Sequence, residues 1–232
     1  MLFNSFEYAL FLPIVFVLYW FIFNRNLRSS NLFLLAVSYL FYGWWDYRFL
    51  SLIILSSLVD FHVGKKLGTT HDIKTKKHLC LLSIIVNLGL LGFFKYYNFF
   101  ITEFVDAFGL STLEGFSSLN VILPVGISFY TFQTLSYSID IYRNKIEPEK
   151  DWVTFFAFVS FFPQLVAGPI ERAANLVPQF RKIRVFKYHN AKDGMRQILW
   201  GLFKKIVIAD SAGLLANDTF GNTELFGTAG LI

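Results

Sequence analysis

Long apolar runs alternate with short polar gaps along most of this sequence. Three of the runs contain no charged residue: Tyr8 to Phe23, Leu119 to Ile139 and Trp152 to Ile170. Further, less uniform runs cover Leu32 to Trp45, Phe49 to Val63, Leu79 to Phe94 and Met195 to Ala209. A helix rises about 1.5 Å per residue and the hydrocarbon core of a bilayer is about 30 Å thick, so about 20 apolar residues make one crossing. The pattern therefore predicts an all-α, polytopic transmembrane bundle of roughly five to seven helices.

The other spanning architecture, a β-barrel, would show alternating apolar and polar residues over about ten positions, whereas these runs are continuous. The first run has no basic residue before it and no small-residue cleavage pattern after Phe23, so we expect it to remain as an anchor. Residues 1–232 are expected to form a single membrane domain.

Composition agrees with a membrane protein. Hydrophobic residues make up 55% of the chain and charged residues only 16%, against roughly 25% in soluble domains. The mean hydropathy is +0.50, and 29 residues are Phe. A soluble enzyme of this length would expose much of that apolar surface to water.

The net charge of +5 is concentrated in the gaps between apolar runs. Two gaps hold most of it, one with Lys65, Lys66, Lys74, Lys76 and Lys77 and one from Arg181 to Arg196. This is the bias of loops that flank membrane helices on the cytoplasmic side. We therefore expect membrane lipid rather than nucleic acid as the partner of the basic residues, and a multi-pass membrane location.

Simple alternation of spans would place the basic stretch after Ile170 outside, against this bias. Either Leu119 to Ile139 or Trp152 to Ile170 is therefore expected to enter the membrane without crossing it. Pro163, Gly168 and Pro169 favour the second run, because proline breaks a helix and broken backbone at membrane depth must be buried in protein or face a watery cavity. The alternative is a loop or amphipathic helix that lies at the interface.

One apolar run carries a stripe of small and polar residues. They recur at spacings of four, three, four and three, which places them on one helix face: Gly126, Tyr130, Gln133, Tyr137 and Asp140. Such a stripe either guides a hydroxyl-bearing substrate or forms hydrogen bonds between helices. Ser128, Thr131 and Ser138 lie off the stripe and are expected to bond their own backbone.

The remaining reactive residues show no catalytic or metal-binding pattern. His62, His71, His78 and His189 are not at metal-ligand spacing, so neither a metal nor another cofactor is predicted. His62 is expected to have a structural role at the membrane boundary. Lys204 and Lys205 must either extend to the membrane surface or face a polar cavity. Arg172 and the stretch Arg181 to Arg196 are candidates to hold an anionic donor or to attract the anionic inner leaflet.

Three segments together resemble the membrane-bound O-acyltransferase family. They are LPVGISFYTFQTLSY from Leu123 to Tyr137, FFPQLVAGPIER from Phe161 to Arg172, and GLFKKIVIAD from Gly201 to Asp210. Phe41 to Trp44 and Lys95 to Tyr97 add to the likeness. In this order the segments are similar to the bacterial branch that O-acetylates alginate and related exopolysaccharides.

The resemblance implies a membrane enzyme that transfers an acyl group, in this branch acetyl, to hydroxyls of an exported polysaccharide such as alginate. It implies a histidine base in a membrane tunnel, an acyl donor from the cytoplasmic side and periplasmic acetylation proteins as partners. The essential histidine of the family lies near a Trp-His pair further downstream, and no such pair occurs before Ile232. We therefore expect these residues to be the amino-terminal half of a longer protein and to lack the catalytic histidine.

The expected contribution of this chain is substrate binding rather than bond making. Tyr130, Gln133 and Tyr137 are assigned to the tunnel wall, and Gly168, Pro169 and Arg172 to the broken segment beside it; no catalytic residue is assigned. Two alternatives remain open from the residues alone. They are a transporter or channel subunit, whose broken helices would give a similar pattern, and a non-catalytic scaffold partner.

Overall fold

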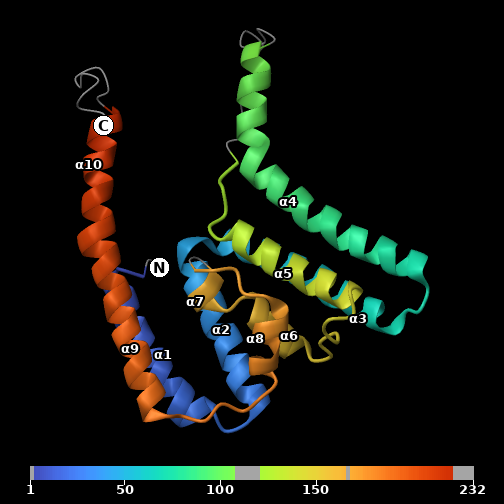
Figure 1. Cartoon of the computed structure of the whole chain (residues 1–232), viewed down its shortest axis with the longest axis horizontal. Helices are drawn as coiled ribbons and strands as arrows, with labels where there is room; N and C mark the ends of the chain where they lie inside the picture. Colours follow the sequence, from blue (N-terminus) through green and yellow to red (C-terminus); the bar gives the residue numbers. More distant parts are fainter. Residues whose placement is uncertain (1–2, 108–120, 166–167, 222–232) are drawn as a thin grey trace. The chain divides into compact units, whose positions relative to one another are not determined.

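The computed structural model describes residues 3–107, 121–165 and 168–221, and within these ranges the chain is helical with no β-strand (Figure 1). This confirms the predicted all-α fold. The described residues form two compact units. One spans Val15–Arg184, and the other combines the described parts of Leu2–Ile14 and Val185–Ile232.

The amino-terminal half of the chain forms the long helices. α1 (Phe6–Leu18) continues into a π-helical segment, η1 (Tyr19–Phe23), and α2 (Leu27–Asp46) is joined to α3 (Leu50–Thr69) by the 3₁₀ turn η2 (Tyr47–Phe49). α4 (Ile73–Ala107) follows after a short turn. Three stretches are long and apolar enough to cross a membrane: Phe6–Phe23, Leu27–Thr69 and Ile73–Ile101.

The start of α4 is set by Asp72. Its carboxylate accepts hydrogen bonds from the hydroxyl of Thr75 (2.6 Å) and from the backbone N–H groups of Thr75 (2.9 Å) and Lys74 (3.3 Å). These donors satisfy N–H groups that the first turn of a helix leaves free. Because they favour the ionised form, with the Thr75 hydroxyl contributing most, they hold the pKa of Asp72 below its ordinary value.

The next part of the chain is broken into short helices. They are α5 (Ile127–Tyr142), α6 (Trp152–Val159), α7 (Phe162–Leu165) and α8 (Ala173–Phe180). The eight residues of α6 rise only about 12 Å, too little to cross a bilayer. The predicted interruption of the run Trp152 to Ile170 is thus confirmed, although Val166 and Ala167 within it lie outside the described residues. With these short helices, three stretches in the described chain meet the length and composition of a span, fewer than the sequence predicted.

α6 is at the centre of the first unit. Every residue from Val153 to Ser160 is buried, as is usual for a helix that is apolar on all sides. It packs against α2, α3 and α8 (Figure 1). Asp151 caps the first turn of α6 by accepting from the backbone N–H (3.0 Å) and hydroxyl (2.8 Å) of Thr154. Ser160 caps the other end of the helix.

The second unit contains α9 (Tyr188–Phe203), the π-helical segment η4 (Lys204–Ala209) and α10 (Asp210–Gly221), none of which has a buried residue. Lys205 forms an ion pair with Asp210, and Nζ of Lys204 lies 5.7 Å from the ring centroid of Trp200. Both lysines in this apolar segment therefore have a local partner that lowers the cost of placing charge there.

Small residues on α3 allow α5 and the loop after it to approach closely. A Cβ atom on Gly64 would lie 2.6 Å from Cε1 of Tyr137, and one on Gly68 would lie 2.3 Å from Cγ of Pro148. Gly64 and Gly68 are four positions apart, so they lie on the same face of the helix. This is the small-residue contact typical of membrane helices.

A buried polar cluster joins α3, α4 and α5. The Asp60 carboxylate accepts hydrogen bonds from the hydroxyls of Ser83 and Ser138 (2.9 Å for Ser138) and from the amide of Asn87 (2.7 Å). The Asn87 amide oxygen in turn accepts from Ser56 (2.8 Å) and Thr134 (3.1 Å). All six side chains are at most 1% exposed. Each of the three helices thus supplies groups that the others need.

The close contact at Gly64 predicts that a glycine-to-alanine change is destabilising there but not at a glycine with open space around it. Gly64→Ala should lower the free energy of unfolding in detergent by about 1–3 kcal/mol, because the new methyl overlaps the Tyr137 ring. Gly89→Ala on α4 is the matched control, since a Cβ there meets nothing within 4 Å, and it should be neutral or stabilising by up to about 1 kcal/mol. Equal effects of the two changes in chemical denaturation would contradict this packing.

The polar cluster predicts a second pair of outcomes on α5. Ser138→Ala should destabilise the protein by about 1.5–3 kcal/mol, because it removes a hydrogen bond to a buried carboxylate. Ser136→Ala should have a much smaller effect, since the Ser136 hydroxyl donates to the Gln133 carbonyl of its own helix. Asp60→Leu should be more harmful than either, because three donors lose their acceptor. The idea fails if Ser138→Ala and Ser136→Ala unfold at the same denaturant concentration.

Candidate functional site

The candidate site is built on α5, whose start is fixed by Gly126. This residue has a φ of +76°, a conformation that glycine adopts far more readily than other residues. A Cβ atom there would lie 2.3 Å from the carbonyl oxygen of Leu165. The glycine of the LPVG motif therefore serves two purposes. It turns the chain into α5 and lets that turn approach the end of α7.

The predicted polar stripe of α5 faces protein on the side of α6. Tyr130 and Tyr137 are 1% and 0% exposed, and the Gln133 amide donates to the carbonyl of Phe158 (3.0 Å). The Tyr137 hydroxyl accepts from the backbone N–H of Glu149 (2.8 Å), and its ring centroid lies 4.7 Å from that of Phe155. Gln133 and Tyr137 thus form hydrogen bonds to other segments of the chain, which is one of the two interpretations that the sequence left open for the stripe.

Tyr130 differs from its neighbours on the stripe. Its hydroxyl oxygen is buried and has no hydrogen-bond partner within the described part of the chain. A buried hydroxyl without a partner is unfavourable by about 1–3 kcal/mol. Such a group is therefore expected to find a partner that the described residues do not supply.

The face of α5 that adjoins the stripe was misjudged from the sequence. Ser138 was expected to bond its own backbone, but its hydroxyl donates to Asp60 on α3. The single hydroxyl proton of Thr134, one turn earlier, is shared between the amide oxygen of Asn87 on α4 and the carbonyl of Thr131. α5 therefore carries two polar faces, and the prediction considered only the one that has the larger side chains.

The broken segment lies at the surface. Gly168 has a φ of +131°, and Gly168, Pro169 and Arg172 are all exposed. The backbone carbonyl of Arg172 accepts from the N–H groups of Asn175 and Leu176, so this residue begins α8 while its side chain remains accessible. No hydrogen bond or ion pair between described residues joins this segment to Tyr130, Gln133 or Tyr137.

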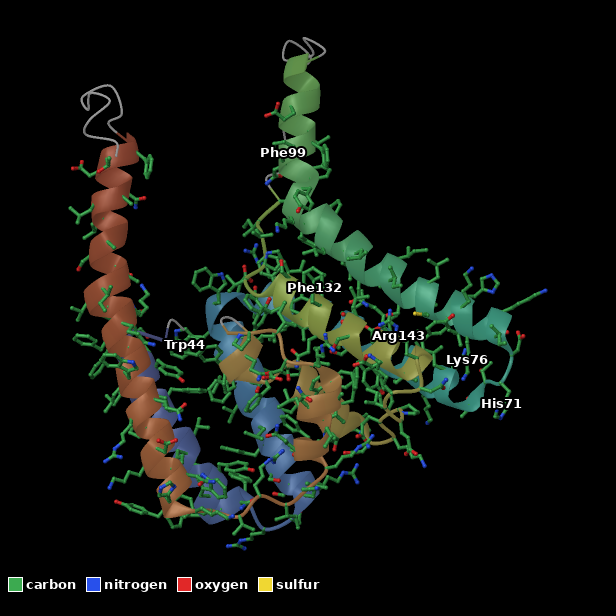
Figure 2. All side chains as sticks on the ribbon, in the orientation of Figure 1. Trp44, His71, Lys76, Phe99, Phe132 and Arg143 are labelled. Carbon is green, nitrogen blue, oxygen red and sulfur yellow. The ribbon has the colours of Figure 1, made fainter. Side chains whose placement is uncertain are left out.

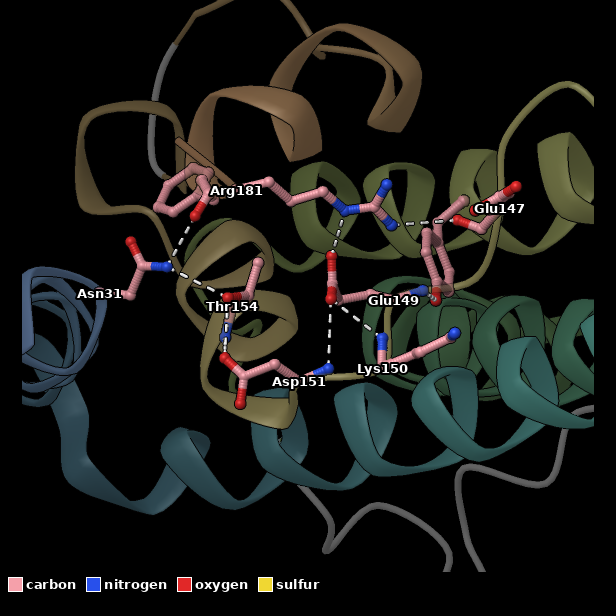
Figure 3. Close-up of polar contacts among 9 residues, drawn as sticks. Asn31, Glu147, Glu149, Lys150, Asp151, Thr154 and Arg181 are labelled. Atoms are coloured by element: carbon pink, nitrogen blue, oxygen red, sulfur yellow. Dashed lines mark hydrogen bonds and ion pairs between the residues drawn. The ribbon is translucent and has the colours of Figure 1, made fainter. Parts of the chain in front are cut away.

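Two residues of the basic stretch are used inside the first unit. Arg181 forms an ion pair with Glu149 (2.7 Å), whose other carboxylate oxygen accepts from the N–H groups of Lys150 and Asp151 (Figure 3). Arg184 donates to the Asn31 amide oxygen (3.1 Å) and to the Tyr19 hydroxyl (2.9 Å). These contacts close the loop before α6 and hold the chain after α8.

Asn31 connects the same region to α6 and α8. Its amide nitrogen donates to the hydroxyl of Thr154 (3.1 Å) and to the carbonyl of Phe180 (2.8 Å), contacts that Figure 3 shows beside the Glu149 cluster. Asn31 itself is fully buried on α2. Its four donor and acceptor contacts explain how a fully polar side chain is accommodated in this apolar unit.

The histidines lie away from these clusters. His62, His71, His78 and His189 are all exposed, and the described residues contain no group of three or more potential metal ligands. Cys80 is buried. The buried residues of the described chain therefore offer hydroxyls, amides and the carboxylates of Asp60, Asp140 and Glu149, but no imidazole that can act as a base.

Comparison with known proteins gives several relatives. The chain is 38% identical over 213 residues to a probable alginate O-acetylase AlgI of Pseudomonas syringae, which is 91% of this chain and 40% of the relative. It is 36% identical over 216 residues to a probable alginate O-acetylase AlgI of Pseudomonas aeruginosa, with 91% and 40% covered. It is 34% identical over 250 residues to a peptidoglycan O-acetyltransferase of Helicobacter pylori, with 95% and 46% covered.

The chain thus spans less than half the length of these relatives. No family model and no solved structure matches the chain. The relatives nevertheless match over more than nine-tenths of it, including the regions of all three motifs. This membrane chain is therefore a homologue of the alginate O-acetylases and of a peptidoglycan O-acetyltransferase, which confirms the resemblance that its motifs predicted.

Proposed function

We propose that this chain is part of a membrane enzyme that transfers an acyl group, acetyl in this case, to hydroxyls of an exported polysaccharide. The observation that carries the proposal is the similarity, over 91–95% of the chain, to relatives whose names give alginate or peptidoglycan as the acetylated polymer. Both are carbohydrate polymers rich in hydroxyls. The similarity favours acyl transfer over the transporter or channel interpretation.

The described residues point to a supporting role in this reaction. Acyl transfer to a hydroxyl needs a general base near the attacking oxygen, and no histidine lies in the described interior. We therefore assign this chain the wall of the site, with Tyr130 as the residue that contacts the acceptor. Its unpaired, buried hydroxyl can donate to or accept from a sugar hydroxyl without losing an existing hydrogen bond. Gln133 and Tyr137 hold the adjoining turns of α5 in place and complete the wall.

We assign the contact with an anionic acyl donor to Arg172 in the broken segment with Gly168 and Pro169. Arg181 and Arg184 are less suitable, because both guanidinium groups are already bound to groups of the first unit. Arg172 is exposed and forms no ion pair with another described residue. The donor is expected to arrive from the cytoplasmic side of the inner membrane, and periplasmic acetylation proteins remain the expected partners.

Tyr130→Phe tests the wall. The change should lower the acetyl content of the exported polysaccharide about tenfold, the equivalent of one hydrogen bond of roughly 1.4 kcal/mol, when it is introduced into the complete gene. It should leave stability unchanged or slightly raised, because the lost hydroxyl has no partner among the described residues.

Tyr47→Phe provides the control, since Tyr47 is 76% exposed and outside α5. Acetylation that is the same in Tyr130→Phe and in the unmodified protein would exclude the wall role. Equal loss of acetylation and of protein in the membrane would show that Tyr130 acts on folding alone.

The orientation can be tested by cysteine labelling in a Cys80→Ala background. Lys187→Cys reports on the basic stretch and should react with a membrane-impermeant maleimide only after the cells are opened. Glu103→Cys, an exposed position near the end of α4, should react in intact cells once the outer membrane is permeabilised. Lys187 is preferred to Arg184, whose side chain is bound inside the first unit. Labelling of Lys187→Cys from the periplasm would refute a cytoplasmic basic stretch.

A further inference from the structure

The outer side of the α3 and α4 pair has a groove that the proposed acyl transfer does not use. Its volume is about 370 Å³, within the range of small-ligand sites. The lining is mostly apolar, with His62 and Lys66 as its polar members. The apolar lining residues are Leu58, Val59 and Val63 from α3 and Leu79 and Leu82 from α4.

The groove has a charged end and an apolar end. Lys66 is the lining residue nearest the turn between α3 and α4, where His71 and Lys76 also lie (Figure 2). In the other direction along the two helices, exposed leucine and isoleucine side chains continue the apolar lining, at Leu55 (48% exposed) on α3 and Ile85 (59% exposed) on α4. Both helices belong to stretches long enough to cross a membrane. The groove thus passes from a charged end to an apolar end, as a phospholipid does from its phosphate to its acyl chains.

The two polar lining residues suit a phosphate group. His62 and Lys66 are four positions apart and share one face of α3. Nδ1 of His62 lies 2.7 Å from the carbonyl oxygen of Leu58 and must donate to it, because a carbonyl can only accept. Nε2 is therefore the ring nitrogen left for a ligand, and it donates to a phosphate oxygen when the ring is the doubly protonated imidazolium, while Lys66 can donate as it stands. Neither residue forms an ion pair with a carboxylate within the described chain.

We propose that this groove binds one anionic phospholipid of the cytoplasmic leaflet. Its phosphate lies against Lys66 and His62, and an acyl chain follows the apolar lining past Leu58 and Leu82 toward the middle of the membrane. An anionic lipid is favoured over a zwitterionic one because the basic end of the α3 and α4 pair attracts net negative charge. The site is independent of acyl transfer, so its test does not depend on enzymatic activity.

The test is native mass spectrometry of the intact protein in a nonionic detergent, with phosphatidylglycerol and phosphatidylcholine of identical acyl chains as probes. We expect one tightly retained phosphatidylglycerol. Lys66→Gln should reduce its retention about fivefold, the effect expected for one lysine near a lipid phosphate. Lys65→Gln is the matched control, because it removes the same charge from the neighbouring position, which does not line the groove. Equal effects of the two changes would overturn the site in favour of general surface charge.

A second pair of variants tests the acyl chain. Leu82→Trp should fill the groove and lower retention of both lipids, whereas Leu81→Trp should not, since Leu81 is equally exposed (47% against 48%) but lies outside the lining. Displacement of the lipid by equimolar inorganic phosphate would overturn the lipid assignment and leave a phosphate site. Absence of retained phosphatidylglycerol in the intact protein would overturn the proposal.

Discussion

A carboxylate inside a membrane helix must receive its hydrogen bonds from the protein, because hydrocarbon supplies none. Asp60 imposes this requirement on the first unit. Its side chain is fully buried, and neutral donors from α4 and α5 are directed at it. Separating any of the three helices would leave the carboxylate or its donors unpaired, so the cluster fixes their rotation as well as their distance. Apolar packing alone would allow these helices to slide along one another, whereas the hydrogen bonds to Asp60 do not.

α5 links this requirement to the proposed wall. Its Thr134 and Ser138 hydroxyls point to the Asp60 cluster, while Gln133 and Tyr137, on the adjoining face, bond the carbonyl of Phe158 and the N–H of Glu149. A rotation of α5 would break both sets together. Tyr130 is therefore held in position by contacts on two faces of its own helix, although its hydroxyl takes part in neither. This arrangement holds in place a buried hydroxyl that has no hydrogen-bond partner among the described residues.

The sequence predicted the helices, the break in the run after Trp152 and the common face of the stripe, since each follows from local periodicity or from proline. It did not predict the Asp60 cluster. Asp60 and Ser138 are 78 positions apart, and a short polar side chain in an apolar run looks the same whether it bonds its own backbone or another helix. Asp60, the single acid within the otherwise apolar run Phe49 to Val63, was the available signal.

The basic stretch shows the same limit for charge. Its composition predicts a membrane-flanking loop, yet Arg184 bonds Asn31, 153 positions away, and Arg181 bonds Glu149. Arginine carries donors in a planar fork that can bind several fixed acceptors, whereas lysine is a flexible point charge. The two arginines nearest α8 therefore bond groups elsewhere in the first unit, whereas Lys182, Lys187 and Lys192 remain exposed. A count of positive charges therefore does not distinguish residues that bond within the protein from residues that remain at its surface. The difference between arginine and lysine side chains does.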